Sequence, residues 1–100
     1  MLLAIDAGNS NLTFGVFSAD SPSPLFHARL ATDRRMTADQ LAMQIGSAFR
    51  LYHMRAEDCG DAVIGSVVSE LTGELARAAG ILTGRAPLVL AHFGPMGRAG

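Results

Sequence analysis

The segment most able to do chemistry is a short run of small and polar residues near the N-terminus, Asp6-Ala7-Gly8-Asn9-Ser10-Asn11. It follows the apolar residues 2–5, a pattern typical of a strand buried on both faces. A tight turn can present backbone N–H groups to a phosphate, and a glycine lets the backbone approach the ligand closely. Amide and hydroxyl side chains can donate further hydrogen bonds. The run therefore predicts a phosphate-binding turn between two strands.

Asp6 is the only carboxylate in this turn. Because Mg²⁺ prefers one or two carboxylates together with waters and phosphate oxygens, Asp6 predicts a Mg²⁺ site, bound directly or through water. The turn lacks the Gly-Lys-Ser/Thr ending of a Walker A loop and the acidic ladder of an EF-hand. The alternative is a hairpin that only satisfies turn geometry. A carboxylate at the end of a buried strand is costly without a purpose, which favours the functional interpretation.

The elements that position the turn follow from hydrophobic periodicity. Strands are predicted near residues 2–7, 11–18, 25–31, 62–68 and 87–91, and helices near 38–53 and 70–79. The order is β-β-β-α-β-α-β, so three strands in a meander precede two strand–helix crossovers. Crossovers make parallel neighbours, which predicts an α/β fold with a mixed five-stranded sheet and helices on its faces. That is the ribonuclease H-like arrangement.

The first helix has the clearest boundary signals. Thr37 and Gln40 fit a capping box, and Met36 and Leu41 fit the hydrophobic staple that accompanies it.

The second helix is less well defined. Ser69 or Thr72 is a candidate cap, and Gly80 is the expected C-terminal stop. The residues predicted to be largely buried across all elements are Leu3, Ile5, Phe14, Val16, Leu41, Ile45, Phe49, Ile64, Val67, Leu75 and Val89.

Length and composition bound the functional classes. One hundred residues with 49% hydrophobic residues and a net charge of -1 fit one folded domain, residues 1–100, and argue against a basic nucleic-acid-binding face. No apolar run approaches the roughly 18 residues of a membrane span, and residues 1–5 are too short for a signal-peptide core. The single cysteine excludes an intrachain disulfide. We therefore expect a cytoplasmic domain with no nucleic-acid or membrane partner.

The remaining reactive side chains favour structural roles. Arg34-Arg35 reads as a solvated turn rather than a phosphate or dimer contact, Cys59 as an inert loop thiol, and Ser66 equally as a cleft-lining or a packed serine. The histidines form no metal-binding pair and are expected to be structural or at the surface: His27, His53 and His92. The acidic residues before the fourth strand read as a polar loop rather than a metal cluster: Glu57, Asp58 and Asp61.

The opening MLLAIDAGNSN, with the following LTFGVF, is similar to the start of type III pantothenate kinases. These enzymes begin with an apolar strand, then Asp-x-Gly-Asn-Thr-Asn, then a glycine-containing strand. The similarity continues in order along the chain through residues 29–32 (RLAT), 37–39 (TAD), 64–68 (IGSVV) and 87–90 (PLVL). Two departures are Ser10, where threonine is usual, and Ser69, where the family often has proline.

The resemblance implies an ATP-dependent kinase that converts pantothenate to 4′-phosphopantothenate, the first step of coenzyme A biosynthesis. It implies Mg²⁺, a monovalent cation (K⁺ or NH₄⁺), and a homodimer with substrate sites near its interface. The implied fold is the half-molecule of the superfamily that contains actin, sugar kinases and acetate kinase. Carried over by position, the ATP phosphate-binding residues are Asp6, Ala7, Gly8, Asn9, Ser10, Asn11, Leu12 and Thr13.

Family members are longer and carry a second, similar domain that holds the general-base aspartate, so we expect it to lie beyond Gly100. We then expect residues 1–100 to be an N-terminal ATPase-like domain with no catalytic residue, inactive alone and prone to self-association. The alternative is a non-catalytic nucleotide-binding regulator, because the family resembles accessory transcription factors. A further alternative is a dimerisation module without a ligand.

Overall fold

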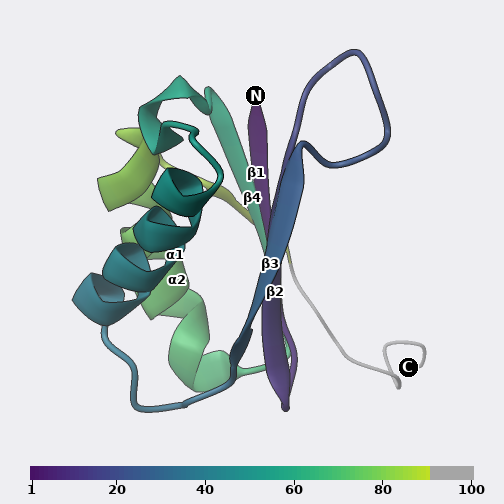
Figure 1. The fold of residues 1–100 in the computed structure, drawn as a ribbon. Helices are drawn as coiled ribbons and strands as arrows, with labels where there is room; N and C mark the ends of the chain where they lie inside the picture. The colour runs from purple at the N-terminus through teal and green to yellow at the C-terminus, as the bar shows by residue number, and fades with distance from the viewer. Residues whose placement is uncertain (91–100) are drawn as a thin grey trace.

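A computed structural model describes residues 1–90 of the chain (Figure 1). Its elements, in chain order, are β1 (Leu2–Ala7), β2 (Asn11–Phe17), β3 (Phe26–Ala31), α1 (Ala38–Leu51), the short 3₁₀ helix η1 (Ala56–Asp58), β4 (Asp61–Ser66), α2 (Ser69–Thr83) and β5 (Leu88–Leu90). The predicted order is confirmed, with β1 at its predicted bounds and the other boundaries within four residues of prediction. Residue 91 of the last predicted strand and His92 lie outside the described residues.

The five strands form one mixed sheet in the order β3-β2-β1-β4-β5. The three N-terminal strands are antiparallel neighbours, because short connections join them. β4 and β5 run parallel to β1 because each follows a helical crossover. The predicted fold class is therefore confirmed. Both α1 and α2 lie on the same face of the sheet, and the opposite face carries no helix formed by residues 1–90 (Figure 1). We call that opposite side the open face.

β1 shows how the one-sided helix layer sets burial. Leu3 and Ile5 point toward the helices and are buried, whereas Leu2 and Ala4 are half-buried and Asp6 is exposed on the open face. Successive side chains on a strand point to opposite faces, so helices on one face bury only every second residue. The prediction that residues 2–5 of β1 are buried on both faces is wrong in the structure of residues 1–90.

The core lies between the sheet and the two helices. Nine of the eleven residues predicted to be buried are buried: Leu3, Ile5, Phe14, Val16, Leu41, Ile45, Phe49, Ile64 and Leu75. Val67 is half-buried, just beyond the end of β4. Val89 is 42% exposed, because β5 has only three residues and lies at the edge of the sheet.

The start of α1 and the end of α2 follow local capping chemistry. The capping box of α1 is confirmed, since Thr37 Oγ1 accepts from the Gln40 N–H and Gln40 Oε1 accepts from the Thr37 N–H. No side chain caps α2, which begins directly after Val68. Gly80 lies inside α2 rather than at its end, and the left-handed Gly84 (φ 74°) terminates the helix instead.

Candidate functional site

The candidate site lies at the edge of the sheet where β1, β4 and β5 all end. Parallel strands finish at the same edge, and α/β proteins commonly bind ligands there. The turn between β1 and β2, residues 8–11, lies at this edge, together with the N-terminal ends of both helices (Figure 1, lower end). The fold therefore places the polar run of the sequence where a ligand can reach it.

Residues outside the hairpin fasten this turn. Within it, the Gly8 N–H donates to the Asn11 carbonyl oxygen at 2.9 Å. From the loop after β3, Thr32 Oγ1 donates to the Gly8 carbonyl oxygen at 2.7 Å, and the Thr32 N–H donates to the Ser10 carbonyl oxygen at 3.1 Å. A Cβ on Gly8 would lie 3.2 Å from the Asn11 oxygen, so a side chain there would force this oxygen to shift by a few tenths of an ångström.

These bonds give the turn a polarity. In both of its bonds to the turn, Thr32 is the donor. The acceptors are the carbonyl oxygens of Gly8 and Ser10. The backbone N–H groups of Asn9 and Ser10 have no acceptor among residues 1–90. Occupied carbonyls and unoccupied N–H groups in successive positions are what an anion-binding backbone concavity needs.

Arg34 contacts the same turn. Its Nη2 donates to Asn9 Oδ1 at 2.8 Å, and its Nε lies 3.7 Å from Glu70 Oε2 in the first turn of α2. Its neighbour Arg35 is exposed and, among residues 1–90, pairs only with Asp33. Both arginines are exposed in a turn after β3, so the prediction of a solvated turn is confirmed. The contact of Arg34 with Asn9 was not predicted, because only the folded chain brings Asn9 within its reach.

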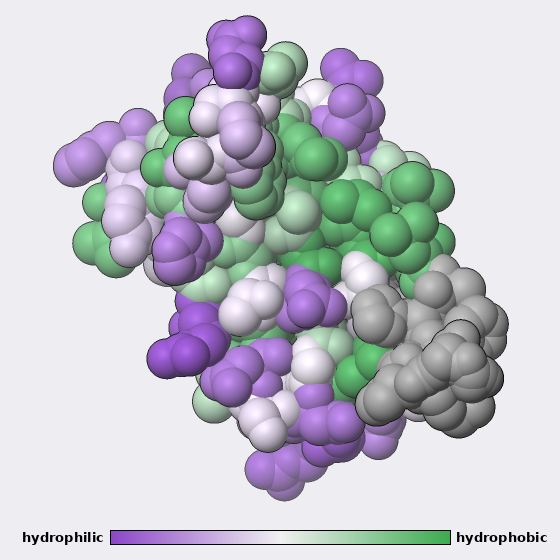
Figure 2. Space-filling view, turned by 90° about the vertical axis from the view of Figure 1, so that its right-hand side faces the viewer, coloured by the Kyte–Doolittle hydropathy of each residue, from purple (hydrophilic) through white to green (hydrophobic). Residues whose placement is uncertain are grey.

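Asp6 and Thr13 face each other across β1 and β2 on the open face. Both side chains are exposed, so the argument that Asp6 is a costly buried carboxylate does not apply. They border a shallow hollow of about 260 Å³ whose other walls include Gly15, Phe17 and His27. In Figure 2, which views the open face, hydrophobic residues gather around its middle and hydrophilic ones toward the lower end, where the turn lies.

A Mg²⁺ ion fits here only if Asp6 and phosphate oxygens bind it together. Residues 1–90 contain no group of three His, Cys, Asp or Glu side chains able to hold a metal by themselves. A single exposed carboxylate beside phosphate-binding N–H groups suits Mg²⁺, which completes its shell with waters and phosphate oxygens. Asp6 at the end of β1 meets that requirement.

Two of the eight predicted phosphate-binding residues have side chains that cannot reach a ligand at this edge. Ala7 and Leu12 are each 1% exposed and belong to the core. The Ala7 carbonyl oxygen accepts from the Val67 N–H at 3.0 Å, which ties the turn to the start of α2. Both residues act through their backbone, whereas Asp6, Asn9, Ser10, Asn11 and Thr13 expose side chains.

The other reactive side chains have structural surroundings. Ser66 Oγ is buried and exchanges hydrogen bonds with the Val68 backbone, which settles its two readings in favour of packing. Cys59 is fully buried, and burial raises the pKa of its thiol. Glu57 and Asp58 form η1, and Asp61 begins β4, as a polar segment before a strand. Thr32 is the site residue that sequence reasoning missed; its only signal was its place in the RLAT segment.

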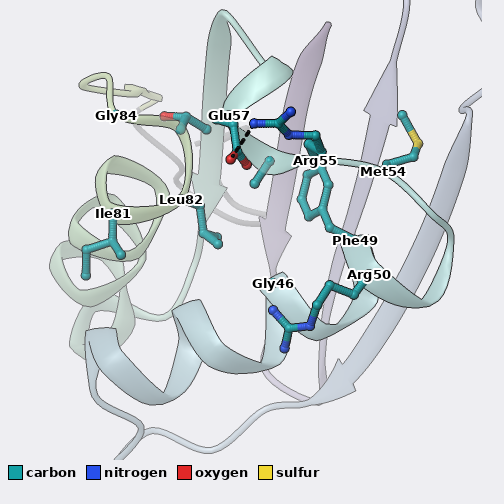
Figure 3. Close-up of a pocket in the computed structure, with 11 residues that line it drawn as sticks. Gly46, Phe49, Arg50, Met54, Arg55, Glu57, Ile81, Leu82 and Gly84 are labelled. Carbon is teal, nitrogen blue, oxygen red and sulfur yellow. Dashed lines mark hydrogen bonds and ion pairs between the residues drawn. The ribbon is translucent and has the colours of Figure 1, made fainter.

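A larger cavity of about 540 Å³ lies at the opposite end of the helix layer (Figure 3). The C-terminal parts of α1 and α2 form it together with η1, and its lining includes Phe49, Leu82, Arg50, Arg55 and Glu57. Arg55 bonds Glu57 at 3.2 Å, and Arg50 bonds Ser47 Oγ at 3.1 Å. Its own backbone N–H and Arg55 lower the pKa of the Glu57 carboxyl. The C-terminal ends of helices carry partial negative charge, which disfavours a phosphate.

Among residues 1–90, neither helix has the length and apolar character needed to cross a membrane.

Comparison with known proteins identifies the family of this chain. Residues 2–95 match the family profile described as type III pantothenate kinase. The type III pantothenate kinase of Finegoldia magna is 33% identical over 90 residues, which cover 90% of this chain and 34% of the relative. That of Exiguobacterium sibiricum is 41% identical over 68 residues, 68% of this chain and 26% of the relative. The chain thus spans about a third of the length of the curated relatives it matches.

The fold also resembles a solved structure. The ROK hexokinase of Thermus thermophilus superposes with a TM-score of 0.64 over 90% of this chain and 34% of its own, at 18% sequence identity. At that identity the likeness concerns the fold alone. The profile match over nearly the whole chain decides the family: this chain belongs to the type III pantothenate kinases.

Proposed function

We propose that residues 1–100 form the phosphate-binding part of a pantothenate kinase, which transfers a phosphoryl group from ATP to pantothenate and yields 4′-phosphopantothenate. One observation carries the proposal: Thr32 occupies the carbonyl oxygens of the β1–β2 turn, while the N–H groups of Asn9 and Ser10 have no acceptor among residues 1–90. Such a turn donates hydrogen bonds to an anion. The names of the relatives supply the substrate, pantothenate, and imply ATP as donor.

Each exposed side chain of the turn has a role in this proposal. The Asn9 and Asn11 amides and the Ser10 and Thr13 hydroxyls donate to ATP phosphate oxygens. The Asp6 carboxylate holds Mg²⁺, directly or through water, and the ion neutralises negative charge on the phosphates. A monovalent cation, K⁺ or NH₄⁺, remains a prediction from the family resemblance.

The turn alone does not complete the reaction. Phosphoryl transfer needs the attacking hydroxyl, the transferred phosphate and the leaving oxygens held together. Because the chain spans about a third of its relatives, we assign the general base and the rest of the pantothenate site to residues outside it. In the cell we place the protein in the cytoplasm, with pantothenate and ATP as its small-molecule partners and no nucleic acid or membrane.

Self-association is part of the proposal. The open face exposes apolar side chains, among them Leu88 at 63% and Leu90 at 49%, and large exposed apolar patches are uncommon on monomers. The net charge of -1 offers little repulsion between copies. We expect sedimentation velocity to show dimers at high concentration. Leu88→Lys should shift the distribution toward monomer, and a wild-type chain that stays monomeric would contradict this part.

Titration calorimetry of ATP with excess Mg²⁺ tests the phosphate site. The wild-type chain should bind weakly, and Asp6→Asn should abolish the Mg²⁺-dependent part of the binding because it removes the only carboxylate at the turn. Asp61→Asn is the matched control, since Asp61 is also exposed at a strand end but lies at the opposite edge of the sheet. Equal affinities of wild type and Asp6→Asn would reduce Asp6 to a turn residue.

A further inference from the structure

We propose that Thr32 and Arg34, from the loop between β3 and α1, are positioning residues that turn the donor groups of the β1–β2 turn toward phosphate. This inference rests on the proposed function, because it concerns the same site. It goes further by assigning the geometry of the turn to two residues of another loop, which lie 24 and 25 positions from the turn residues that they bond.

Thr32 controls the backbone of the turn. A two-strand turn has both carbonyl oxygens and N–H groups near its tip, and a carbonyl that faces a phosphate repels it. Thr32 takes two carbonyl oxygens out of competition, that of Gly8 through its hydroxyl at 2.7 Å and that of Ser10 through its N–H at 3.1 Å. The N–H groups of Asn9 and Ser10 are left without acceptors among residues 1–90.

Arg34 controls a side chain of the turn. A guanidinium has only donors, so its 2.8 Å contact with Asn9 must be made to the amide oxygen, as the structure has it. With Oδ1 occupied, the Asn9 NH₂ group remains as the part of the amide that can serve a ligand. Without Arg34, the amide could rotate and present its oxygen, which a phosphate repels.

Glu70 holds Arg34 from the other side. The 3.7 Å ion pair joins Arg34 to the first turn of α2, and a third bond, from the Val67 N–H to the Ala7 oxygen, fastens the base of the turn to the same connection. Both partners of the ion pair are about half-exposed, so its contribution is to direct the guanidinium rather than to stabilise the fold. The turn is thus held between the β3–α1 loop and the β4–α2 connection.

Four variants separate these roles. Thr32→Val keeps the shape and the backbone N–H but removes the hydroxyl, and Thr32→Ser restores it. Arg34→Gln removes the contact with Asn9, and Arg35→Gln removes the same charge from a neighbour that does not touch the turn. Each is titrated calorimetrically with ATP plus Mg²⁺ and with inorganic tripolyphosphate, and its thermal unfolding is recorded.

We expect Thr32→Val to weaken both ligands about fivefold to tenfold, with Thr32→Ser close to wild type. Arg34→Gln should weaken them by roughly threefold or more, and Arg35→Gln by less. The role of Thr32 would be overturned by wild-type affinity in Thr32→Val, or by a Thr32→Ser variant that binds as weakly as Thr32→Val. The role of Arg34 would be overturned if Arg34→Gln and Arg35→Gln lost equal affinity.

Amide hydrogen exchange keeps this inference separate from the proposed function. The Gly8 N–H, which bonds the Asn11 oxygen inside the turn, should exchange faster in Thr32→Val than in Thr32→Ser without any ligand. If the wild-type chain binds neither ligand, the proposed function fails, and positioning for phosphate fails with it even where exchange shows that Thr32 orders the turn. If the wild-type chain binds but exchange and affinity are unchanged in Thr32→Val, only the positioning role fails.

Discussion

The β1–β2 turn and the cavity between the helix C-termini lie at opposite ends of the molecule and differ in how their polar groups are used. The cavity is the larger space, about 540 Å³, but its arginines bond side chains of their own or the adjoining segment (Figure 3). The turn encloses little volume, yet two of its N–H groups have no acceptor among the described residues. Hydrogen-bonding capacity left unused at a strand edge, rather than the size of a hollow, identifies the candidate site.

The difference also concerns what holds each region together. The arginines at the cavity bond side chains within their own segments, whereas residues of two other connections, β3–α1 and β4–α2, fasten the turn. The hydrogen bonds that hold the turn therefore come from outside its own hairpin. Three predictions test this contrast, and a fourth concerns the core.

The largest effect concerns turnover. The chain alone should release no ADP in a pantothenate-dependent manner, because the proposed function assigns the general base and the rest of the pantothenate site to residues outside it. Loss of a general base alone typically costs about 10²- to 10⁴-fold. A coupled ADP-release assay, with the full-length Finegoldia magna relative as positive control, measures this. Turnover by the 100-residue chain would mean that residues 1–100 suffice for catalysis.

Gly8→Ala should weaken ATP·Mg²⁺ binding by about tenfold and destabilise the fold by roughly 1 kcal/mol. The new Cβ would meet the Asn11 carbonyl oxygen at 3.2 Å, and that oxygen cannot retreat easily because it accepts from the Gly8 N–H. Calorimetric titration and urea unfolding give the two quantities. Unchanged affinity would remove the turn from the phosphate site.

Cys59 predicts a loss of stability at alkaline pH that has nothing to do with the turn. Burial raises the thiol pKa in the folded state, so its contribution is present below the pKa of the unfolded thiol and is lost as pH rises toward the folded value. Above about pH 8.5 the free energy of unfolding should fall by up to about 1.4 kcal/mol per pH unit. Urea unfolding at pH 7 to 10 measures this slope. Cys59→Ala should remove the slope, and an identical slope in that variant would place its origin elsewhere.

Gly46→Ala is the counterpart of Gly8→Ala at the cavity end and should have the smallest effect. Its Cβ would meet Leu82 Cδ2 at 3.3 Å, a flexible side chain beside open space, so Leu82 can move away. Replacing glycine inside α1 should then stabilise the chain by up to about 1 kcal/mol. Thermal unfolding checks this, and nucleotide affinity should not change. A destabilised variant would show that the helices cannot adjust there.

The sequence by itself determined the element order, the capping box of α1, most of the core and the location of the polar turn. These follow from local rules, since hydrophobic period, caps and turn residues act over a few positions. The prediction for Asp6 failed because its exposure follows from both helices lying on one face, which is decided by distant elements. The end of α2 at Gly84 rather than Gly80 is a local glycine signal, since the sequence offers two glycines there and Gly84 adopts the left-handed conformation.

Only the tertiary structure decided which residues complete the site. Thr32 and Arg34 reach the turn because β3 pairs with β2 in a register that sets Ala31 opposite Asn11. Pairing between strands is set by sheet-wide burial and by the connections, and no residue near Thr32 reveals what its hydroxyl will meet. The turn's chemistry was therefore readable in six consecutive residues, whereas its polarity depends on contacts that exist only after the sheet has formed.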